Sequence, residues 1–377
     1  MTALQGLPHV DYYAPAFRVE IDGEQLAPAT NGDVLSLSVK MDIEQMTSFE
    51  MTVANIATFR SASQTFKYSD GDQFDIGRQV HIKMGYADGL LSMITGQITS
   101  VSPKFPQQGP PTLTVSGQDG LFKLKDRKPE DGEQIQYLGM HDWEIAENIA
   151  QRNNLRVVVT REGPMHQEVI QRMTDDATFL KERAARIDFD CHVLTDPESG
   201  EATLHFVKPT DGRAGAIQSF AYRWGQDLLH FTPTINMSEQ VGSVTVHGWD
   251  PDTKAPIVAT AGPDDLPRQP DAGESGPEAA ARTQSGKQDV VVDAPVANHQ
   301  EAFELARSLL LQRAYRFITA AGQVIGKPEL RPGHNLELSG LGRFDGSYYV
   351  TKVEHQIDAN GYLTSFEARK IVHRVPA

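Results

Sequence analysis

The sequence predicts a mainly β protein in which two β modules of similar size bracket an α+β insert. Short runs of alternating apolar and polar residues fill the first third of the 377-residue chain and return near its end. Apolar residues at helical spacing are concentrated in the middle third. Turn dipeptides such as Asp22-Gly23 separate the alternating runs. Many short antiparallel strands separated by turns are typical of a barrel or a sandwich.

The first third predicts a β-barrel module over residues 1–125, completed by strands from about 215–250. Its apolar side chains alternate in five runs: 17–21, 35–41, 49–53, 80–84 and 113–115. Period-two spacing places one face of each strand on a core and the other toward water or a partner.

Residues 126–212 predict a small α+β insert domain. Ile145, Ala146, Ile149 and Ala150 follow helical spacing, with Asn153-Asn154 as the expected stop. A second helix is expected in TDDATFLKERAARIDFD. Its N-cap is Asp175 or Asp176, because either carboxylate suits a helix N-terminus. Strands are expected at 155–160, 191–194 and 204–207.

Residues 213–258 are expected to hold return strands and a connection, and residues 259–289 a flexible loop or linker. The segment 262–289 contains one leucine, several prolines and many small polar residues. Such a composition buries too little apolar surface to offset the entropy lost on ordering.

Residues 290–377 predict a helix followed by a second β-barrel module. Asn298 is the expected N-cap, and Glu301 completes a capping-box pattern. The expected buried stripe is Phe303, Ala306, Leu310 and Phe317. Pro332-Gly333, Asp345-Gly346 and Asn360-Gly361 mark the turns between the final strands.

Composition limits the classes of function. The net charge of −15 argues against binding of nucleic acid over a broad face, because such a surface repels phosphate. Cys191 is the single cysteine, so no internal disulfide can form, which fits assembly in a reducing cytoplasm. The sequence shows no secretory signal and no apolar run of membrane-spanning length.

Candidate chemical sites are few. His141 and Glu144 resemble half of a metal motif, but a helix N-terminal turn is the favoured interpretation. Asp70, Asp72 and Asp75 lack the order of an EF-hand loop, and a solvated loop is favoured. We therefore predict no catalytic residues, no cofactor and no metal.

Two alternatives stay open at this point. Asp188 and Asp190 could form a carboxylate pair for glycan cleavage, although a helix end and turn explain them equally well. A glycan-binding surface is the other alternative, drawing on a LysM-like helix at 141–155. Its aromatic candidates are Tyr348, Tyr349, Tyr362 and Phe366, for which core packing is favoured.

Several motifs together resemble the phage late-control D family, which forms the baseplate hub of contractile tails. FDIGRQVHIKMGY followed by MITGQITSV resembles a strand pair of that family, and LTVSGQDGLFKL resembles the next strand. The segments 175–193, 241–251 and 330–370 follow in family order. The structural positions that carry the resemblance are Gly77, Gly85, Gly96, Asp119, Gly333, Gly346 and Gly361.

The resemblance implies two tube-like antiparallel β-barrel modules plus a small α+β domain, assembled as a homotrimer. Three chains would form a ring of six similar modules, joining a six-fold tail tube to a three-fold spike. The implied partners are a separate spike protein, the tail-tube protein, and sheath or wedge baseplate proteins. No enzymatic activity and no stable nucleic-acid or membrane binding are expected.

The resemblance also implies a location. The protein would be assembled in the bacterial cytoplasm and would be a component of a phage virion or a phage-tail-like particle. Carboxylates lining the lumen would give the negative charge a role.

Overall fold

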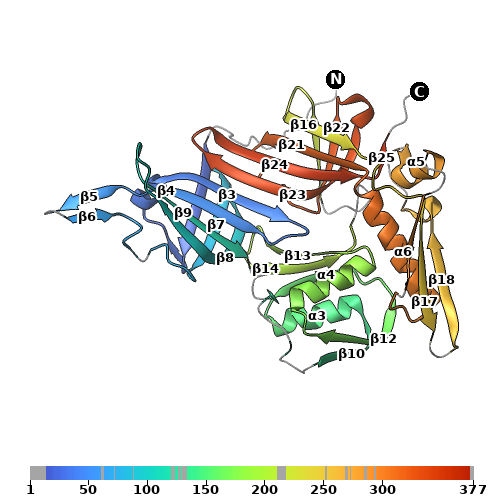
Figure 1. The fold of residues 1–377 in the computed structure, drawn as a ribbon. Helices are drawn as coiled ribbons and strands as arrows, with labels where there is room; N and C mark the ends of the chain where they lie inside the picture. Colours follow the sequence, from blue (N-terminus) through green and yellow to red (C-terminus); the bar gives the residue numbers. More distant parts are fainter. Residues whose placement is uncertain are drawn as a thin grey trace, which may run out of the picture.

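A computed structural model gives the fold of the chain (Figure 1). It describes residues 14–60, 63–71, 73–87, 89–119, 124–125, 129, 134–209, 218–250, 253–267, 271, 273–283, 287–292 and 294–373. The predicted mainly β fold class is confirmed, with one large sheet and an insert of mixed structure.

The large sheet has 13 strands and runs through both β modules. Its main path is β16-β21-β24-β23-β3-β4-β9-β8-β7-β1-β2, and β22 links β15 to β23. The first-module strands are β1 (Pro15–Ile21), β2 (Glu24–Gln25), β3 (Val34–Asp42), β4 (Ser48–Ala54), β7 (Gln79–Tyr86), β8 (Gly89–Lys104) and β9 (Thr112–Asp119). The second-module strands are β15 (Ser219–Arg223), β16 (Leu228–Ile235), β21 (Ile318–Ile325), β22 (Asn335–Ser339), β23 (Gly346–Asp358) and β24 (Gly361–Lys370).

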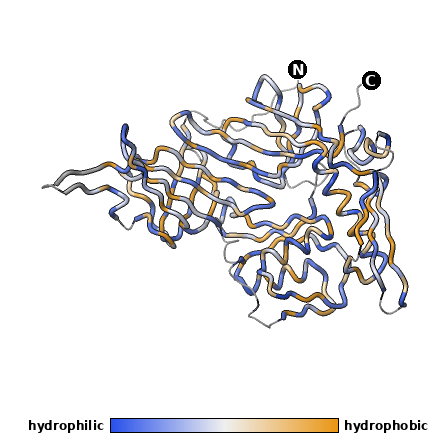
Figure 2. Tube along the Cα trace, viewed as in Figure 1, coloured by the Kyte–Doolittle hydropathy of each residue, from blue (hydrophilic) through white to orange (hydrophobic). Residues whose placement is uncertain are grey.

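Each β module has its own core, although the sheet is continuous. Alternation of apolar and polar residues along the strands produces these cores, as Figure 2 shows by colour. Fully buried side chains of the first core include Leu37, Val39 and Met51. Phe317 and Tyr348 lie in the second core. The short helix α1 (Pro28–Gly32) and the hairpin β5 (Ala57–Arg60) with β6 (Ser63–Phe66) extend the first module.

The insert lies below the large sheet in Figure 1 and packs its helices on two small sheets around one core. Its elements are β10 (Gln134–His141), α3 (Asp142–Arg152), β11 (Arg156–Val159), β12 (Met165–Arg172), α4 (Asp176–Arg186), β13 (Asp190–Thr195) and β14 (Ala202–Val207). Both predicted helices are confirmed, and all four residues of the first stripe are buried. Asp175 is the N-cap, and its side chain accepts a hydrogen bond from the Thr178 N–H at 2.8 Å.

A further three-stranded sheet packs against the long helix α6 (His299–Ala314). Its strands are β17 (Ser243–Asp250), β18 (Ala255–Ala261) and β20 (Gln288–Val291). The N-cap prediction for α6 is confirmed, because the Asn298 side chain accepts from the Glu301 N–H at 2.9 Å. Ala306 and Leu310 are buried as expected, but Phe303 is half-buried and Phe317 lies beyond the helix end.

The prediction of a flexible loop or linker over 259–289 is wrong for most of that segment. It contains the end of β18, the short helix η1 (Pro263–Asp265), β19 (Glu274–Ser275), α5 (Gly276–Thr283) and the start of β20. The segment packs into the protein despite its small residues, because Ala261, Ala279 and Ala280 are buried. β19 also pairs with β25 (Val372–His373) near the chain end. No helix within the described residues is long and apolar enough to cross a membrane.

Candidate functional site

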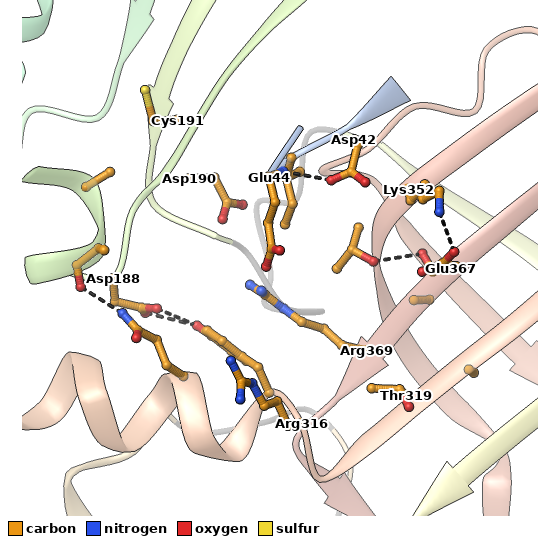
Figure 3. A pocket seen from close by; sticks show the side chains of 18 of the residues that line it. Asp42, Glu44, Asp188, Asp190, Cys191, Arg316, Thr319, Lys352, Glu367 and Arg369 are labelled. Atoms are coloured by element: carbon orange, nitrogen blue, oxygen red, sulfur yellow. Dashed lines mark hydrogen bonds and ion pairs between the residues drawn. The ribbon is translucent and has the colours of Figure 1, made fainter. Parts of the chain in front are cut away.

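A cleft of about 690 Å³ lies where the insert, α6 and the large sheet meet (Figure 3). The insert contributes the start of β13, and the sheet contributes β23 and β24. The segment following β3 and the end of α6 complete the wall. Charged side chains of both signs line it: Asp42, Glu44, Lys181, Asp188, Asp190, Arg316, Lys352, Glu367 and Arg369.

The two candidate carboxylates of the insert are held by tyrosine hydroxyls. The hydroxyl of Tyr315 donates to both oxygens of Asp188, at 2.8 and 3.0 Å. The hydroxyl of Tyr349 donates to Asp190. Asp188 has a φ of 57°, a left-handed conformation that Asp tolerates at the end of a helix. These contacts fasten the insert to α6 and to the second module.

Cationic side chains of the cleft interact with aromatic rings, a carboxylate and a backbone carbonyl. The Arg369 guanidinium lies 3.5 Å from the ring centroid of Tyr315 and 4.8 Å from that of Tyr349. Lys352 forms an ion pair with Glu367 at 2.6 Å. Burial lowers the pKa of Lys181, whose ammonium donates to the Glu44 carbonyl.

Cys191 is buried beside the cleft, and burial raises its pKa to about 12. The side chain is therefore a protonated thiol rather than a nucleophilic thiolate at neutral pH. The cleft thus holds paired charges, phenol–carboxylate contacts and cation–π contacts. This chemistry joins domains together, and the cleft lies at the end of the contact between the two β modules.

The other sequence candidates lie apart from one another. Glu144 accepts from the His141 N–H at 2.8 Å, which confirms the helix N-terminal turn. Asp70 accepts from the Phe66 N–H at 2.6 Å. Asp75 accepts from the N–H of the next residue. Asp72 lies outside the described residues.

The aromatic candidates for a glycan surface are core residues, as favoured. Tyr348, Tyr349, Tyr362 and Phe366 are each at most 4% exposed. Within the described residues, no group of three or more His, Cys, Asp or Glu side chains is arranged to hold a metal ion.

Among the described strands, the large sheet passes from one β module to the other through an edge-to-edge joint of β3 and β23. The strands pair antiparallel from Asp42 opposite Lys352 to Leu37 opposite Ile357. Leu37 is fully buried, and Ile357 is 8% exposed and packs in the core of the first module. The joint therefore combines a backbone ladder with shared apolar packing.

The two modules repeat the same strand order. The first runs β3-β4-β9-β8-β7-β1 and the second runs β16-β21-β24-β23-β22-β15. Each of the first four pairings is antiparallel in both modules. The last pairing differs, because β1 is antiparallel to β7 whereas β15 is parallel to β22.

Irregularities occur at matching places in both modules. The register shifts at Thr99, between Ile98 and Ser100, and again at Thr351 in the equivalent strand. The Thr99 hydroxyl donates to the Ser116 carbonyl at 3.5 Å, and the Thr351 hydroxyl donates to the Glu367 carbonyl at 3.2 Å.

A second matching shift lies at Leu35 in β3 and at Leu229 in β16. These side chains are exposed to almost the same extent, 48% and 46%. Matching bulges are specific features of a sheet, so the modules are structural repeats.

The structural positions predicted from the sequence lie in both modules. Gly77 and Gly333 precede equivalent strands, with φ values of 90° and 88°. Gly96 is required by close approach, because a Cβ there would lie 2.2 Å from the Gln118 carbonyl oxygen. Gly85 lies near the β7–β8 turn, Gly346 begins β23, and Gly361 begins β24 after the last hairpin.

Asp119 ends β9 in the first module and is buried. Its backbone N–H donates to the Thr47 carbonyl at 3.0 Å, and its side chain accepts from the Thr47 N–H at 3.2 Å. The equivalent residue of the second module is Lys370, which pairs with Asp271 at 2.5 Å. Sequence reasoning missed the role of Lys370, because Asp271 is distant in the chain.

Comparison with known families gives the family of the chain. The model of the Alg8 N-terminal domain matches residues 13–359. The chain belongs to the Alg8 N-terminal domain family. The assignment to the late-control D family is therefore wrong. Its glycine and strand pattern follows from the geometry of the β modules, so it reports the fold and not the family. A search of curated proteins found no match.

Solved structures share the fold of this Alg8 N-terminal domain family member. The prophage MuSo2 43 kDa tail protein from Shewanella oneidensis is 12% identical with a TM-score of 0.67, covering 95% of this chain and 98% of that chain. A tail protein from Neisseria meningitidis MC58 is 13% identical with a TM-score of 0.68, covering 95% and 97%. An Escherichia coli component of the type VI secretion system is 13% identical with a TM-score of 0.58, covering 95% and 79%. At these identities, the likeness shows a common fold.

Proposed function

We propose that the protein is a structural hub in the baseplate of a contractile tail or injection machine. In this role it adapts a six-fold tail tube to a three-fold spike as a homotrimer. The observation that carries the proposal is the repeat of one β module within the chain, joined edge to edge through β3 and β23. A chain with two equivalent modules presents six of them in a trimer, which matches a six-fold neighbour while keeping threefold symmetry.

The shared fold supports the same role. A prophage tail protein, a second tail protein and a type VI secretion component have this fold along most of their own length. The spike, the tube protein, and sheath or wedge proteins are the proposed partners. Assembly would take place in the bacterial cytoplasm, and the product would be a virion or a phage-tail-like particle.

The proposed role is not enzymatic. Asp188 and Asp190 are each held by a tyrosine hydroxyl, and Cys191 is a buried protonated thiol. This cleft fastens domains, as a part that must withstand the firing of a sheath requires. A peptidoglycan-clearing assay on the purified protein should therefore give no activity.

Affinity purification from the native host tests the role directly. The tagged chain should bring down tube, spike and sheath proteins in constant ratio, with three copies of the chain for each spike trimer. Recovery without any of these components, or with a membrane enzyme complex instead, would contradict the proposal.

A further inference from the structure

Several strand edges are open in the described part of the chain, and those of β8 and β16 are two of them. β8 pairs with β7 only as far as Ile98, and no described strand continues along that side over Thr99–Lys104. β16 pairs with β21 on one side, and only Leu228 has a bridge on the other, to Trp224. Six strands separate β16 from β8 in the sheet order, and Figure 1 draws them in different modules.

These open edges are the counterparts of the two strands that already form a joint. The strand orders equate β8 with β23 and β16 with β3, and the bulges fix the alignment residue by residue. Val101 corresponds to Val353, and Phe105 to Ile357. Ile235, likewise, corresponds to Met41.

Burial differs sharply between the formed joint and its open counterpart. In the formed joint, Val353 and Met41 are fully buried and Ile357 is 8% exposed. At the open edges, Val101 and Ile235 are only half-buried, and Phe105 is 56% exposed. Phe231 is half-buried, whereas its counterpart Leu37 is 0% exposed. The open edges therefore expose apolar side chains at the positions whose counterparts are buried in the formed joint.

We propose that β8 of one copy pairs antiparallel with β16 of the next copy, repeating the joint between β3 and β23. Transferring the register places Val101 opposite Ile235, Ser102 opposite Thr234 and Phe105 opposite Phe231. This inference rests on the proposed function and names the contact that closes the ring. One joint lies inside each chain and one between chains, so every module meets its neighbours in the same way.

The chemistry of this seam between copies differs from that of the internal joint. The internal joint places Asp42 opposite Lys352 and Lys40 opposite Glu354. The equivalent pairs between copies are uncharged. Ser102 takes the place of Glu354, and Thr234 takes the place of Lys40. Pro103 faces Pro233, and neither can donate a backbone hydrogen bond across the seam. Because these backbone hydrogen bonds are missing, apolar contacts contribute more of the association energy. Proline at an open edge also disfavours pairing with unrelated strands.

A cysteine pair tests the register. The variant Ser102→Cys/Thr234→Cys should form covalent trimers on mild oxidation, because cross-strand partners lie close enough for a disulfide. The native Cys191 thiol is buried with a raised pKa and should not interfere. Each single variant is a matched control and should give no covalent trimer.

A second pair tests the competing arrangement. Glu24→Cys/Thr234→Cys links β16 to β2, which are the two ends of the main strand path. Cross-linking of this pair, or a trimer by light scattering without the Ser102–Thr234 cross-link, would overturn the seam and leave the proposed function standing. No cross-link in either pair together with a monomer by light scattering would overturn both.

Discussion

Gly77 and Gly333 make the same backbone contact in the two β modules. The Gly77 N–H donates to the Ile98 carbonyl at 2.9 Å, and the Gly333 N–H donates to the Val350 carbonyl at 2.9 Å. In each module the acceptor residue directly precedes the bulge threonine. Both glycines have a left-handed φ near 90°. The repeat therefore extends from strand order to individual hydrogen bonds. These hydrogen bonds also mark where β8 stops pairing with β7 and where β23 stops pairing with β22.

Replacing either glycine by alanine should destabilise the fold by the same amount. A Cβ added at either position would make only ordinary van der Waals contacts. At Gly77 it would lie 3.6 Å from Gln97 Nε2, and at Gly333 it would lie 3.7 Å from the Tyr349 hydroxyl. The left-handed backbone is therefore the source of the loss, about 1–2 kcal/mol for each variant. Urea unfolding measures the change, with Gly32→Ala as the control because its Cβ would meet open space without a positive φ. Equal stability of wild type and both variants would contradict the conformational argument.

His166 joins the insert to α6 through two carboxylates. It contacts Asp142 at 2.9 Å and Glu301 at 3.1 Å, while Arg183 pairs with Asp142 at 2.5 Å and lies 2.7 Å from the imidazole. Arg186 adds further positive charge nearby. Burial opposes the charged imidazole, but hydrogen bonds to the two carboxylates raise the pKa of His166 above its ordinary value. Burial likewise opposes ionisation of Asp142, while its contacts with His166 and Arg183 hold its pKa below the ordinary value.

The stabilising effect of this cluster should depend on pH. The contribution of His166 is fully present below its unfolded pKa of 6.5 and is lost as the pH rises through its raised folded pKa. The contribution of Glu301, whose pKa is lowered by the His166 hydrogen bond, is present above 4.5 and is lost as the pH falls. His166→Gln should therefore lower the free energy of unfolding by about 1.5–3 kcal/mol near pH 6 and by less at alkaline pH.

Chemical unfolding over a pH series checks this prediction. The control is His230→Gln, because the His230 side chain is exposed on β16. A loss in His166→Gln that is the same at every pH would show that the imidazole acts only through its size and shape.

Tyr315→Phe should loosen the cleft between the insert and α6. The variant removes the donor of both hydrogen bonds to Asp188 and leaves a buried carboxylate with less compensation. We expect a loss of about 1–3 kcal/mol in unfolding free energy. A double-mutant cycle with Asp188→Asn isolates the contact, and a coupling energy near zero would show that the phenol and the carboxylate act independently.

Added salt should not weaken assembly. The proposed seam between copies sets Ser102 against Thr234 and contains no opposed charges, so screening has little to weaken. Sedimentation of the protein in low salt and in about 1 M salt should show a trimer fraction that does not fall as salt is added, because salt also screens the repulsion between chains of net charge −15. Dissociation on adding salt would show that charged surfaces outside β8 and β16 hold the copies together.

Local features of the fold were predictable because they depend on neighbouring residues. The caps at Asp175 and Asn298 and the buried helix stripe at Ile145 follow from spacing alone. The segment 259–289 was not predictable in the same way. Its small residues form α5 and β19 only because β25 and α6 cover them from distant parts of the chain.

The repeat between modules could not be found as a short-period pattern. In the sequence, the repeat is visible only as a glycine followed at some distance by a tetrapeptide. The tetrapeptide consists of an apolar residue, threonine, any residue and valine: ITSV from Ile98 and VTKV from Val350. The distance from glycine to this tetrapeptide differs between the modules, so no fixed period exists. The same geometric constraint explains the mistaken family assignment, because these positions are set by the sheet.

The mass of the purified protein in solution tests the central claim most directly. Sedimentation equilibrium over a range of concentrations should give three times the chain mass of 41.5 kDa, with no larger species, because the ring of six modules is closed. The variant Phe105→Asp should shift this equilibrium toward single chains without unfolding them, since the side chain is exposed in the isolated chain. A single-chain mass at every concentration, or an open series of larger assemblies, would contradict the closed ring.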